Sequence, residues 1–171
     1  MIAEVQASHF ARLAPGLATL LQECVAEGAS IGFIAPFSAQ DASQYWQHKV
    51  AGKLGQPRFS LWVVEVAGEV AATVQLDAQT PANQRHRGEV AKLMVSPRYR
   101  RQGLARQLLA ALEEKARQWQ LTLLTLDTRT GDKAEPLYLA MGYQVAGCIP
   151  GFALSVDGSR LDATTVMYKG I

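Results

Sequence analysis

The spacing of apolar residues predicts two helices in the N-terminal part of the chain. Between Ser8, which has the side chain of a helix N-cap, and Gly28, which suits a helix end, apolar residues recur every three or four positions at Phe10, Leu13, Leu17, Leu20, Leu21 and Val25. The segment 29–36 (ASIGFIAP) is apolar but short and contains glycine and proline, so we expect a loop or a short extended piece. Ser38 then predicts the cap of a second helix that runs to about Val50.

The middle of the chain carries three segments of strand-forming residues. Residues 59–66 (FSLWVVEV) and 70–76 (VAATVQL) are rich in β-branched and aromatic side chains and flank a tight Ala67-Gly68 turn, which predicts a β-hairpin. After a polar loop, residues 89–95 (EVAKLMV) predict a third strand that stops at Ser96-Pro97. Together these segments indicate an antiparallel meander.

A helix and a buried strand follow the meander. From Gly103 to about Trp119 the apolar residues fall on one face, which predicts an amphipathic helix. Residues 121–126 (LTLLTL) predict a strand, and a strand-helix-strand unit normally makes its two strands parallel. The predicted sheet is therefore mixed. In the rest of the chain, residues 135–141 predict a short helix, and residues 143–149 and 161–169 predict two extended segments. Turns are predicted at Pro150-Gly151 and Asp157-Gly158.

Length and composition indicate an ordinary globular protein. A chain of 171 residues with 49% hydrophobic and 19% charged residues suits one folded domain, which we expect to span residues 1–171. No apolar run is long enough to span a bilayer and the N-terminus lacks a leader pattern, so we expect a cytoplasmic protein without a membrane partner. The histidines show no metal-ligand spacing, and Cys24 and Cys148 lie far apart in sequence. We therefore predict no metal site and no disulfide, and we expect both cysteines to be buried.

Positive charge is concentrated in one segment although the net charge is only +2. Residues 85–106 contain seven Lys or Arg and a single acid, Glu89. The segment could meet phosphate groups, or it could be a solvated basic face. A nucleic-acid partner is disfavoured because the basic segment lacks interleaved aromatic residues beyond Tyr99.

The most informative motif, RRQGLA, lies between the third strand and the amphipathic helix. A helix start offers unpaired N–H donors, and small residues at Gly103 and Ala105 allow a pyrophosphate to approach the backbone. The motif lacks both the G-x-G-x-x-G and the G-x-x-x-x-G-K-[ST] patterns, which argues against a dinucleotide site and a P-loop. The alternative is an ordinary loop with a helix-initiating glycine.

The order of these elements resembles the GNAT acetyltransferases. The resemblance is carried by R-x-x-G-x-A after a strand and loop, by the amphipathic helix and strand that follow, and by a short helix with Leu137-Tyr138 before Met141-Gly142-Tyr143. Longer strings resemble the tabtoxin-resistance branch of that family: GASxGF at 28–33, LWVV at 61–64, EVxKLMV at 89–95, LDT at 126–128 and PG at 150–151. The family's fold is an α/β (α+β) acyl-CoA N-acyltransferase fold, in which a mixed, mostly antiparallel sheet with about four flanking helices splays apart at two parallel strands.

The resemblance implies acetyl-CoA as the cofactor and assigns residues to it. The loop binds the coenzyme A pyrophosphate and the preceding strand pairs with the pantetheine arm, which gives as cofactor-binding residues Leu93, Met94, Val95, Arg100, Arg101, Gln102, Gly103, Leu104 and Ala105. Many family members carry an asparagine before the short helix, where this chain reads Gly131-Asp132-Lys133, and Asp132 takes that place as a cofactor-binding candidate.

Three side chains are candidates for catalysis by this resemblance. Tyr138 resembles the family tyrosine that points at the thioester sulfur, where a phenol can protonate the departing thiolate, although it could equally be a core aromatic. Glu89 and Asp127, at adjacent strand ends, can hold or deprotonate a substrate amine. Otherwise Asp127 closes a turn, and Glu89 pairs with Arg87 or Lys92 on the surface.

The resemblance predicts an N-acetyltransferase that moves acetyl directly from acetyl-CoA to the amine of a small molecule, an amino-acid-like toxin, antibiotic or metabolite, as in antibiotic or toxin resistance. Ser30, Phe33 and Trp46 are expected to form one wall of the acceptor pocket, or Phe33 and Trp46 only seal the N-terminal helices onto the sheet. The alternatives are acetylation of a protein N-terminus or lysine, and a non-catalytic acyl-CoA sensor. Many relatives pair through their C-terminal strands, so a homodimer is expected.

Overall fold

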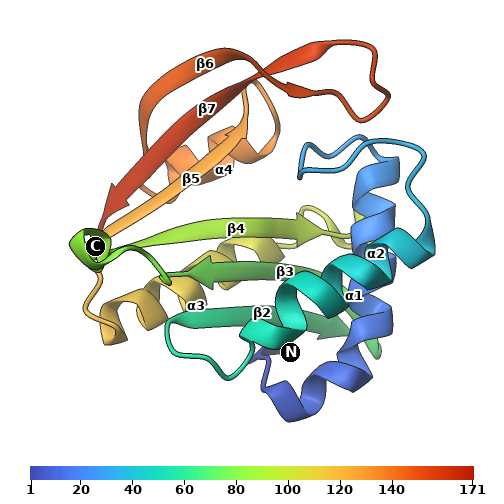
Figure 1. Cartoon of the computed structure of the whole chain (residues 1–171), viewed down its shortest axis with the longest axis horizontal. Helices are drawn as coiled ribbons and strands as arrows, with labels where there is room; N and C mark the ends of the chain where they lie inside the picture. Colours follow the sequence, from blue (N-terminus) through green and yellow to red (C-terminus); the bar gives the residue numbers. More distant parts are fainter.

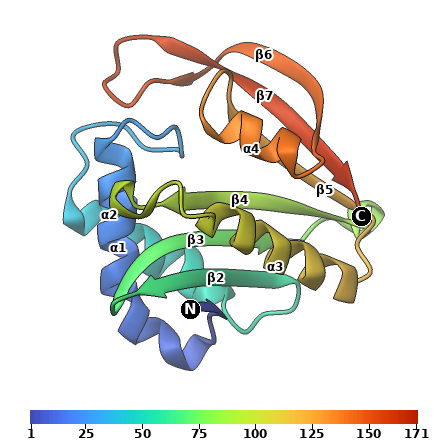
Figure 2. The same cartoon turned by 180° about the vertical axis from the view of Figure 1, so that it is seen from behind.

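The computed structural model describes residues 1–171 and shows one seven-stranded sheet with helices on both faces (Figure 1, Figure 2). The strands lie in the order β1-β2-β3-β4-β5-β7-β6, and only the pairing of β4 with β5 is parallel. Their bounds are β1 Ile2–Glu4, β2 Phe59–Val66, β3 Glu69–Asp77, β4 Arg87–Val95, β5 Leu123–Arg129, β6 Gln144–Leu154 and β7 Leu161–Gly170. The predicted mixed, mostly antiparallel sheet is confirmed.

Four α-helices cover the sheet. Figure 1 shows α1 (Phe10–Ala26) and α2 (Ala39–Tyr45) in front of the sheet, and Figure 2 shows α3 (Leu104–Gln118) and α4 (Ala134–Ala140) on the other side. Beyond α2 the chain continues as a π-helical segment, Trp46–Val50, and a 3-10 turn, Ala51–Lys53. No helix of this protein is long and apolar enough to cross a membrane.

Two apolar cores lie on the two faces of the sheet because strand residues alternate between them. In β2, Leu61 and Val63 join the core under α1, whereas Trp62 and Val64 join the core under α3. This alternation explains why β2 reads as a nearly continuous apolar run and shows no clear period of two. Strands β2 and β3 are buried on both faces, whereas β6 at the far edge is exposed.

The two parallel strands stay together for a short distance only. Residues Arg87 to Glu89 of β4 pair with Leu123 to Thr125 of β5, and beyond these pairs the strands diverge (Figure 1). β5 instead pairs with β7 along its whole length. At the point of divergence Gly88 packs so closely that a Cβ there would lie 2.8 Å from Leu76 Cδ1 and 2.9 Å from Leu121 Cδ1. A side chain at residue 88 would clash with Leu76 and Leu121 next to the last residues at which β4 and β5 pair.

A β-bulge interrupts β4 just past the point of divergence. Thr73 pairs with Met94 and Gln75 with Ala91, so two residues of β4, Lys92 and Leu93, oppose one residue of β3. Lys92 has a φ of 52°, a left-handed value that costs a non-glycine residue on the order of 1 kcal/mol. The bulge turns the side chain of Lys92 toward α2 and the loop before it, where it lies near the aromatic rings of Phe33 and Tyr45.

The structure departs from the sequence prediction at several element ends. Ser38 caps α2 in a reciprocal capping box with Asp41, as predicted, but Ser8 makes no capping hydrogen bond, and a short 3-10 turn precedes α1. The strand β1 was not predicted, since three residues are too few to show a period. The prediction of a turn at Pro150-Gly151 is wrong, because β6 continues through these two residues. They cause only a shift of register in the pairing of β6 with β7, between Ile149 and Ala153.

The burial of Leu112 gives a test of the second core. Leu112 is 0% exposed beneath α3, and its replacement by alanine removes buried methyl groups and leaves a cavity. We expect Leu112→Ala to lower the free energy of unfolding by about 2–5 kcal/mol in denaturant titrations. Leu139→Ala is the control, because Leu139 on α4 is 49% exposed, and it should change that free energy by less than about 0.5 kcal/mol. Equal losses in both variants would contradict the described packing.

Candidate active site

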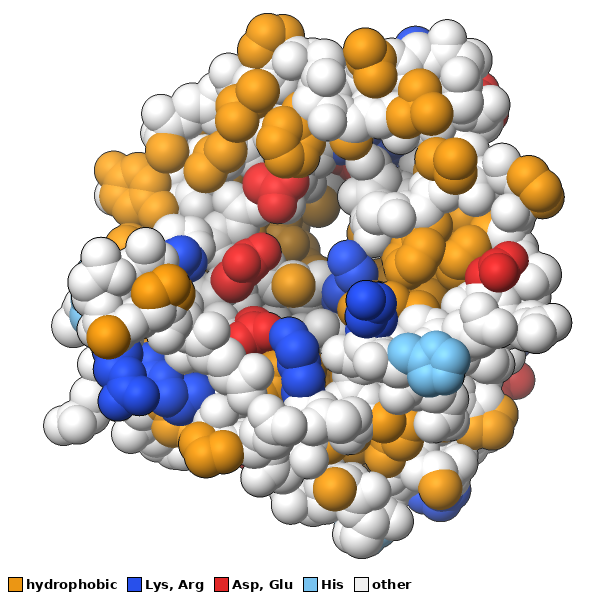
Figure 3. Space-filling model, in the orientation of Figure 1, with side chains coloured by type: hydrophobic (Ala, Val, Ile, Leu, Met, Phe, Trp, Pro, Cys, Tyr) orange, Lys and Arg blue, Asp and Glu red, His pale blue; other side chains and the backbone are white.

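A cleft of about 840 Å³ opens where β4 and β5 diverge. It continues from the start of α3 past α4 to the loop that follows α1, and residues of β6 and β7 form its far wall. Figure 3 shows the molecule hollowed on the side of α1 and α2, with acidic and basic side chains around the hollow. Thirty-two residues line the cleft, and they include thirteen of the sixteen residues predicted for the site. The three predicted residues that do not line it are Gln102, Phe33 and Trp46.

The loop before α3 forms a corner of the cleft at the start of a helix. Arg101 and Gly103 have left-handed φ values of 63° and 78°, and Gly103 is the N-cap of α3. The first backbone hydrogen bond of the helix is donated by Gln107 to Gly103, so the N–H groups of the first turn point out of the helix without intrahelical acceptors. These donors and the positive end of the helix dipole favour a phosphate.

The arginines around this corner are not equivalent. Arg100 turns back to the protein, where its guanidinium lies 3.6 Å from the Glu27 carboxylate and 3.4 Å from the Val95 carbonyl. Arg101 and Arg106 are exposed, line the cleft and form no ion pair with the chain. The positive charge available to a ligand therefore comes from Arg101 and Arg106 more than from Arg100.

The edge of β4 that faces the cleft is not paired with a strand beyond Glu89. Ser96 donates its backbone N–H to Ala71 of β3 over 2.8 Å. Because N–H groups alternate in direction along a strand, the N–H of Val95 points to the other side, toward the diverging β5. The N–H of Val95 is thus available to an amide-containing arm of a ligand, whereas the Val95 carbonyl accepts from Arg100 and the side chain of Met94 is buried in the core under α1.

Tyr138 projects from α4 to the floor of the cleft. Its side chain is 6% exposed, its ring meets Tyr143 edge to face at 5.6 Å, and its hydroxyl makes no hydrogen bond with the chain. Burial, helped by the nearby charge of Asp127, raises the pKa of Tyr138 far above its ordinary value. The phenol therefore stays protonated at every physiological pH.

Glu89 and Asp127 face the same opening from the two diverging strands. Both are exposed to the cleft, and neither forms an ion pair. Asp127 accepts a 3.0 Å hydrogen bond from the Thr164 hydroxyl. Asp127 does not close a turn, since β5 continues past it to Arg129. Glu89 does not pair with Arg87, since the Arg87 guanidinium donates to Gln84. Both carboxylates remain available to a bound cation or proton.

The predicted acceptor wall is only partly in place. Ser30 lines the cleft, and Phe33 is half-buried against Phe37 and Tyr45, with ring centroids 4.7 Å and 5.3 Å away. Trp46 does not reach the cleft: it is 0% exposed in the core under α1, where its Nε1 donates to the Leu17 carbonyl over 2.9 Å. Its neighbour Tyr45 does not line the cleft either, but its ring lies 5.7 Å from the ammonium of Lys92, which does.

Asp132 lies in the cleft but is bound by the protein. Its carboxylate accepts hydrogen bonds from Arg129 over 3.1 Å and from the backbone N–H of Lys133 over 2.7 Å. These bonds fix the turn before α4, which favours a structural role over direct contact with a cofactor.

Two cleft residues were missed at the sequence level. Lys92 was visible only as a lysine within EVAKLMV, and the bulge that turns it toward Phe33 and Tyr45 could not be foreseen. Arg129, at the end of β5, donates to the Gly28 carbonyl over 3.0 Å and so joins the loop after α1 to the start of α4. The only sequence signal for Arg129 was its place just after the predicted strand.

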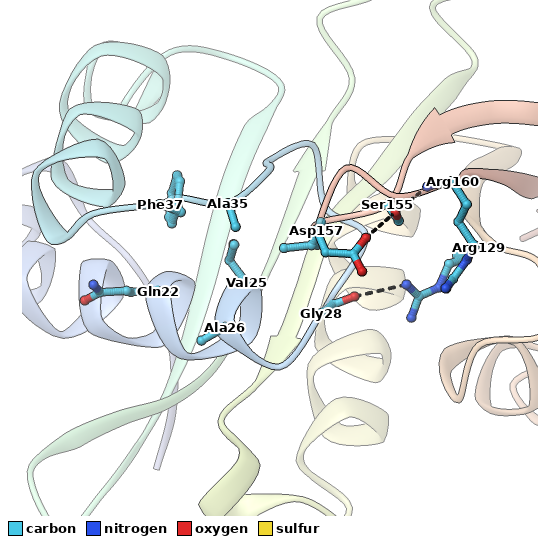
Figure 4. Close-up of a pocket in the computed structure, with 11 residues that line it drawn as sticks. Gln22, Val25, Ala26, Gly28, Ala35, Phe37, Arg129, Ser155, Asp157 and Arg160 are labelled. Carbon is cyan, nitrogen blue, oxygen red and sulfur yellow. Dashed lines mark hydrogen bonds between the residues drawn. The ribbon is translucent and has the colours of Figure 1, made fainter.

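A second cavity of about 440 Å³ lies behind the loop that follows α1 (Figure 4). Its polar groups already bind one another. The Asp157 carboxylate accepts hydrogen bonds from Ser155 and Ser159, which hold the pKa of that carboxyl well below its ordinary value, and Arg129 is bound to Gly28 and Asp132. We interpret this cavity as a structural junction between α1 and the turn before β7.

The comparisons with known proteins agree on one family. Residues 18–143 match the model described as the acetyltransferase (GNAT) family. An uncharacterized N-acetyltransferase encoded in the hisH-hisA intergenic region of Azospirillum brasilense is 32% identical over 116 residues, which are 67% of this chain and 67% of that protein. Other curated relatives are matched over 41% to 59% of their own lengths.

Solved structures share the fold at low sequence identity. The ribosomal-protein-alanine N-acetyltransferase of Brucella melitensis superimposes with a TM-score of 0.79 at 20% identity, covering 100% of this chain and 99% of the other. The acetyltransferase yncA of Salmonella typhimurium, solved with acetyl-CoA, gives a TM-score of 0.78 at 17% identity and covers 99% of this chain and 92% of that one.

The two cysteines differ in accessibility, which corrects the expectation that both are buried. Cys24 is buried, and burial raises the pKa of its thiol to about 11, whereas Cys148 on β6 is exposed. At pH 8 a thiol with a pKa near 11 is about 0.1% thiolate, the form that reacts with disulfide reagents. We expect the native protein to react rapidly with one equivalent of a disulfide reagent and the unfolded protein with two. Cys148→Ser should abolish the rapid phase, and rapid labelling that persists in this variant would contradict the placement of Cys24.

Proposed function

Because this chain belongs to the GNAT family of acetyltransferases, whose members use acetyl-CoA, it is an acetyl-CoA-dependent acyltransferase, and we propose that it acetylates the amine of a small molecule. The observation that carries the proposal is the cleft at the divergence of β4 and β5, where a phosphate-binding corner, a free strand edge, a buried tyrosine and two carboxylates line one cavity.

The cleft residues fit the parts of acetyl-CoA. The N–H groups at the start of α3, with Arg101 and Arg106, suit the pyrophosphate, and the free edge of β4 from Leu93 to Val95 suits the amides of the pantetheine arm. Acetyl-CoA when bound supplies a reactive thioester. Gln102 does not line the cleft, and the carboxylate of Asp132 is engaged elsewhere, so we propose no cofactor contact through either side chain.

Glu89 and Asp127 prepare the acceptor. An ammonium group must lose a proton before its nitrogen can attack a carbonyl carbon, and either carboxylate can take that proton directly or through water. We propose that the N–H of Val95, which points away from β3, stabilises negative charge on the acetyl oxygen.

Tyr138 assists the leaving group. Its raised pKa keeps the phenol protonated, so it can donate its proton to the departing thiolate. Cys24, with a pKa of about 11, is a poor nucleophile at neutral pH, which supports direct transfer within a ternary complex over an acyl-cysteine route.

The enclosure of the cleft supports a small acceptor. The loop after α1 and the β6 residues Phe152 and Ala153 border the acceptor side, and the cleft of 840 Å³ has to hold acetyl-CoA as well, which leaves limited room for the acceptor. We place the substrate among amino-acid-like toxins, antibiotics or metabolites, on the resemblance to the tabtoxin-resistance branch. Acetylation of a protein terminus or lysine would need an open groove for an extended chain.

Assembly and organisation are proposed on separate grounds. The edge strand β6 exposes a row of apolar side chains, which supports a homodimer paired through the C-terminal strands; the row is Val145, Ile149, Phe152 and Leu154. The unbroken sheet supports a single domain over residues 1–171. The cytoplasmic location stays a prediction from the sequence.

The first test is thiol release from acetyl-CoA against amino acids, amino-acid-like toxins, polyamines and peptides, with Tyr138→Phe as the diagnostic variant. We expect turnover of a small amine, and a kcat reduced by about 100-fold or more in Tyr138→Phe with little change in the KM for acetyl-CoA. Because the pKa of Tyr138 is raised, the wild-type rate should show no decline attributable to this phenol up to pH 9.5. Tyr168→Phe, an exposed tyrosine on β7, is the control. Cofactor binding without turnover on any acceptor would instead indicate a sensor.

The second test concerns the phosphate corner. Arg101→Gln removes an exposed charge at the start of α3, and we expect a KM for acetyl-CoA raised about 3- to 10-fold with kcat nearly unchanged. The effect should shrink as the salt concentration rises, because exposed charges are screened. Arg117→Gln, at the other end of α3, should leave both constants unchanged. An unchanged KM in Arg101→Gln would contradict the assignment of this corner to the cofactor.

A further inference from the structure

Lys92 brings a positive charge to the acceptor side of the cleft. The bulge in β4 places its ammonium 5.9 Å from the ring centre of Phe33 and 5.7 Å from that of Tyr45, beneath the loop after α1. The Cβ that Gly32 lacks would lie 3.9 Å from this nitrogen, so the loop passes directly over it. Lys92 lines the same cavity as Glu89 and Asp127.

The ammonium of Lys92 has no acceptor within the protein. It lies within electrostatic reach of Asp127 and Glu89, yet it forms neither a hydrogen bond nor an ion pair within 4.0 Å with either carboxylate. The aromatic rings attract it through their faces but use none of its three N–H donors. Burial lowers the pKa of Lys92, while the two carboxylates act in the opposite direction.

The other cations that line this cleft are either bound within the protein or stand at the start of a helix, as Lys133 does at the N-cap of α4. Arg129 donates to Gly28 and Asp132, and Arg100 is paired with Glu27. Arg101 and Arg106 lie at the start of α3, in the corner assigned to phosphate. Lys92 is thus the cation beside the two carboxylates whose donors remain unused.

The charges on the acceptor side therefore suit one kind of molecule. A wholly cationic acceptor such as a polyamine would gain from Glu89 and Asp127 but would be repelled by Lys92. An acceptor that carries an anionic oxygen group close to its amine matches both signs. The half-buried setting strengthens such a pairing compared with one in open water.

We infer that Lys92 is a specificity-determining residue that binds an anionic oxygen group of the acceptor, so that the acceptor is an amino-acid-type zwitterion. Its ammonium end lies at Glu89 and Asp127, and its carboxylate, or a comparable oxyanion, lies against Lys92 below Gly32. This inference rests on the proposed function, since it names the substrate class of the same cleft.

The test compares pairs of acceptors in two enzymes. Each standard L-amino acid and its carboxamide, which has the same skeleton without the negative charge, is assayed for thiol release with wild type and Lys92→Met. The methionine keeps an unbranched stem against Phe33 and Tyr45 and removes the charge. The ratio of kcat/KM for acid over amide, compared between the two enzymes, cancels differences in amine pKa.

We expect wild type to prefer the acids, and Lys92→Met to lower the acid-to-amide ratio by about 10- to 100-fold, mainly through the KM of the acid. Lys92→Arg should retain most of the preference, and Lys49→Met, an exposed lysine outside the cleft, should retain all of it. Melting temperatures of the variants show whether each is folded. An unchanged ratio in folded Lys92→Met, or a wild-type preference for the amides, would overturn the inference while leaving acetyl transfer to small amines intact.

A binding measurement separates this inference from the proposed function. If no small amine is turned over, the proposed function fails, and the same acid and amide pairs are then tested for thermal stabilisation in the presence of coenzyme A. Stabilisation of wild type by the acid that is lost in Lys92→Met and kept in Lys92→Arg would still support the Lys92 site. Equal stabilisation by acid and amide, or none by either, would overturn it.

Discussion

The parallel contact between β4 and β5 is limited to the pairs from Arg87–Leu123 to Glu89–Thr125, and the cleft exists because it ends there. β5 stays paired with β7 along its whole length, so it leaves β4 together with β7. Gly88, within the paired part of β4, packs closely against Leu76 and Leu121 because it has no side chain. Past this point the backbone donors of β4 face a cavity inside the sheet, and a buried N–H that lacks a strand partner requires another acceptor.

The same divergence brings groups together that lie far apart in sequence. Glu89 and Asp127 stand on the two strands that separate, Tyr138 is supplied by α4, and the start of α3 closes one end. The rigid sheet behind them fixes their relative positions, which favours catalysis because little reorganisation is then needed. Arg129 ties the loop after α1 to the turn before α4, so both borders of the cleft are anchored to the end of β5.

The chain shares its fold with acetyltransferases that are 20% identical or less, and at that distance the fold is compatible with many acceptors. The acceptor is selected by local features that the fold does not dictate. In this chain the bulge at Lys92 places one lysine in the cleft with the two carboxylates of Glu89 and Asp127, and the rings of Phe33 and Tyr45 lie beside that lysine. A change of residue 92 would alter the charges that line the cleft.

The sequence by itself determined the order of the main helices and strands and the mixed sheet, because these depend on local periodicity. The resemblance to a known family added the candidates Glu89, Asp127, Tyr138 and the loop before α3, and these residues, apart from Gln102, do line one cleft. The sequence could not place Trp46 in the core, because two adjacent aromatic residues at helical spacing look alike until the neighbouring helix is known. It could not show the bulge that turns Lys92 into the cleft or the engagement of Asp132 by Arg129. Those features arise from contacts between segments distant in sequence, and only the tertiary structure decides such contacts.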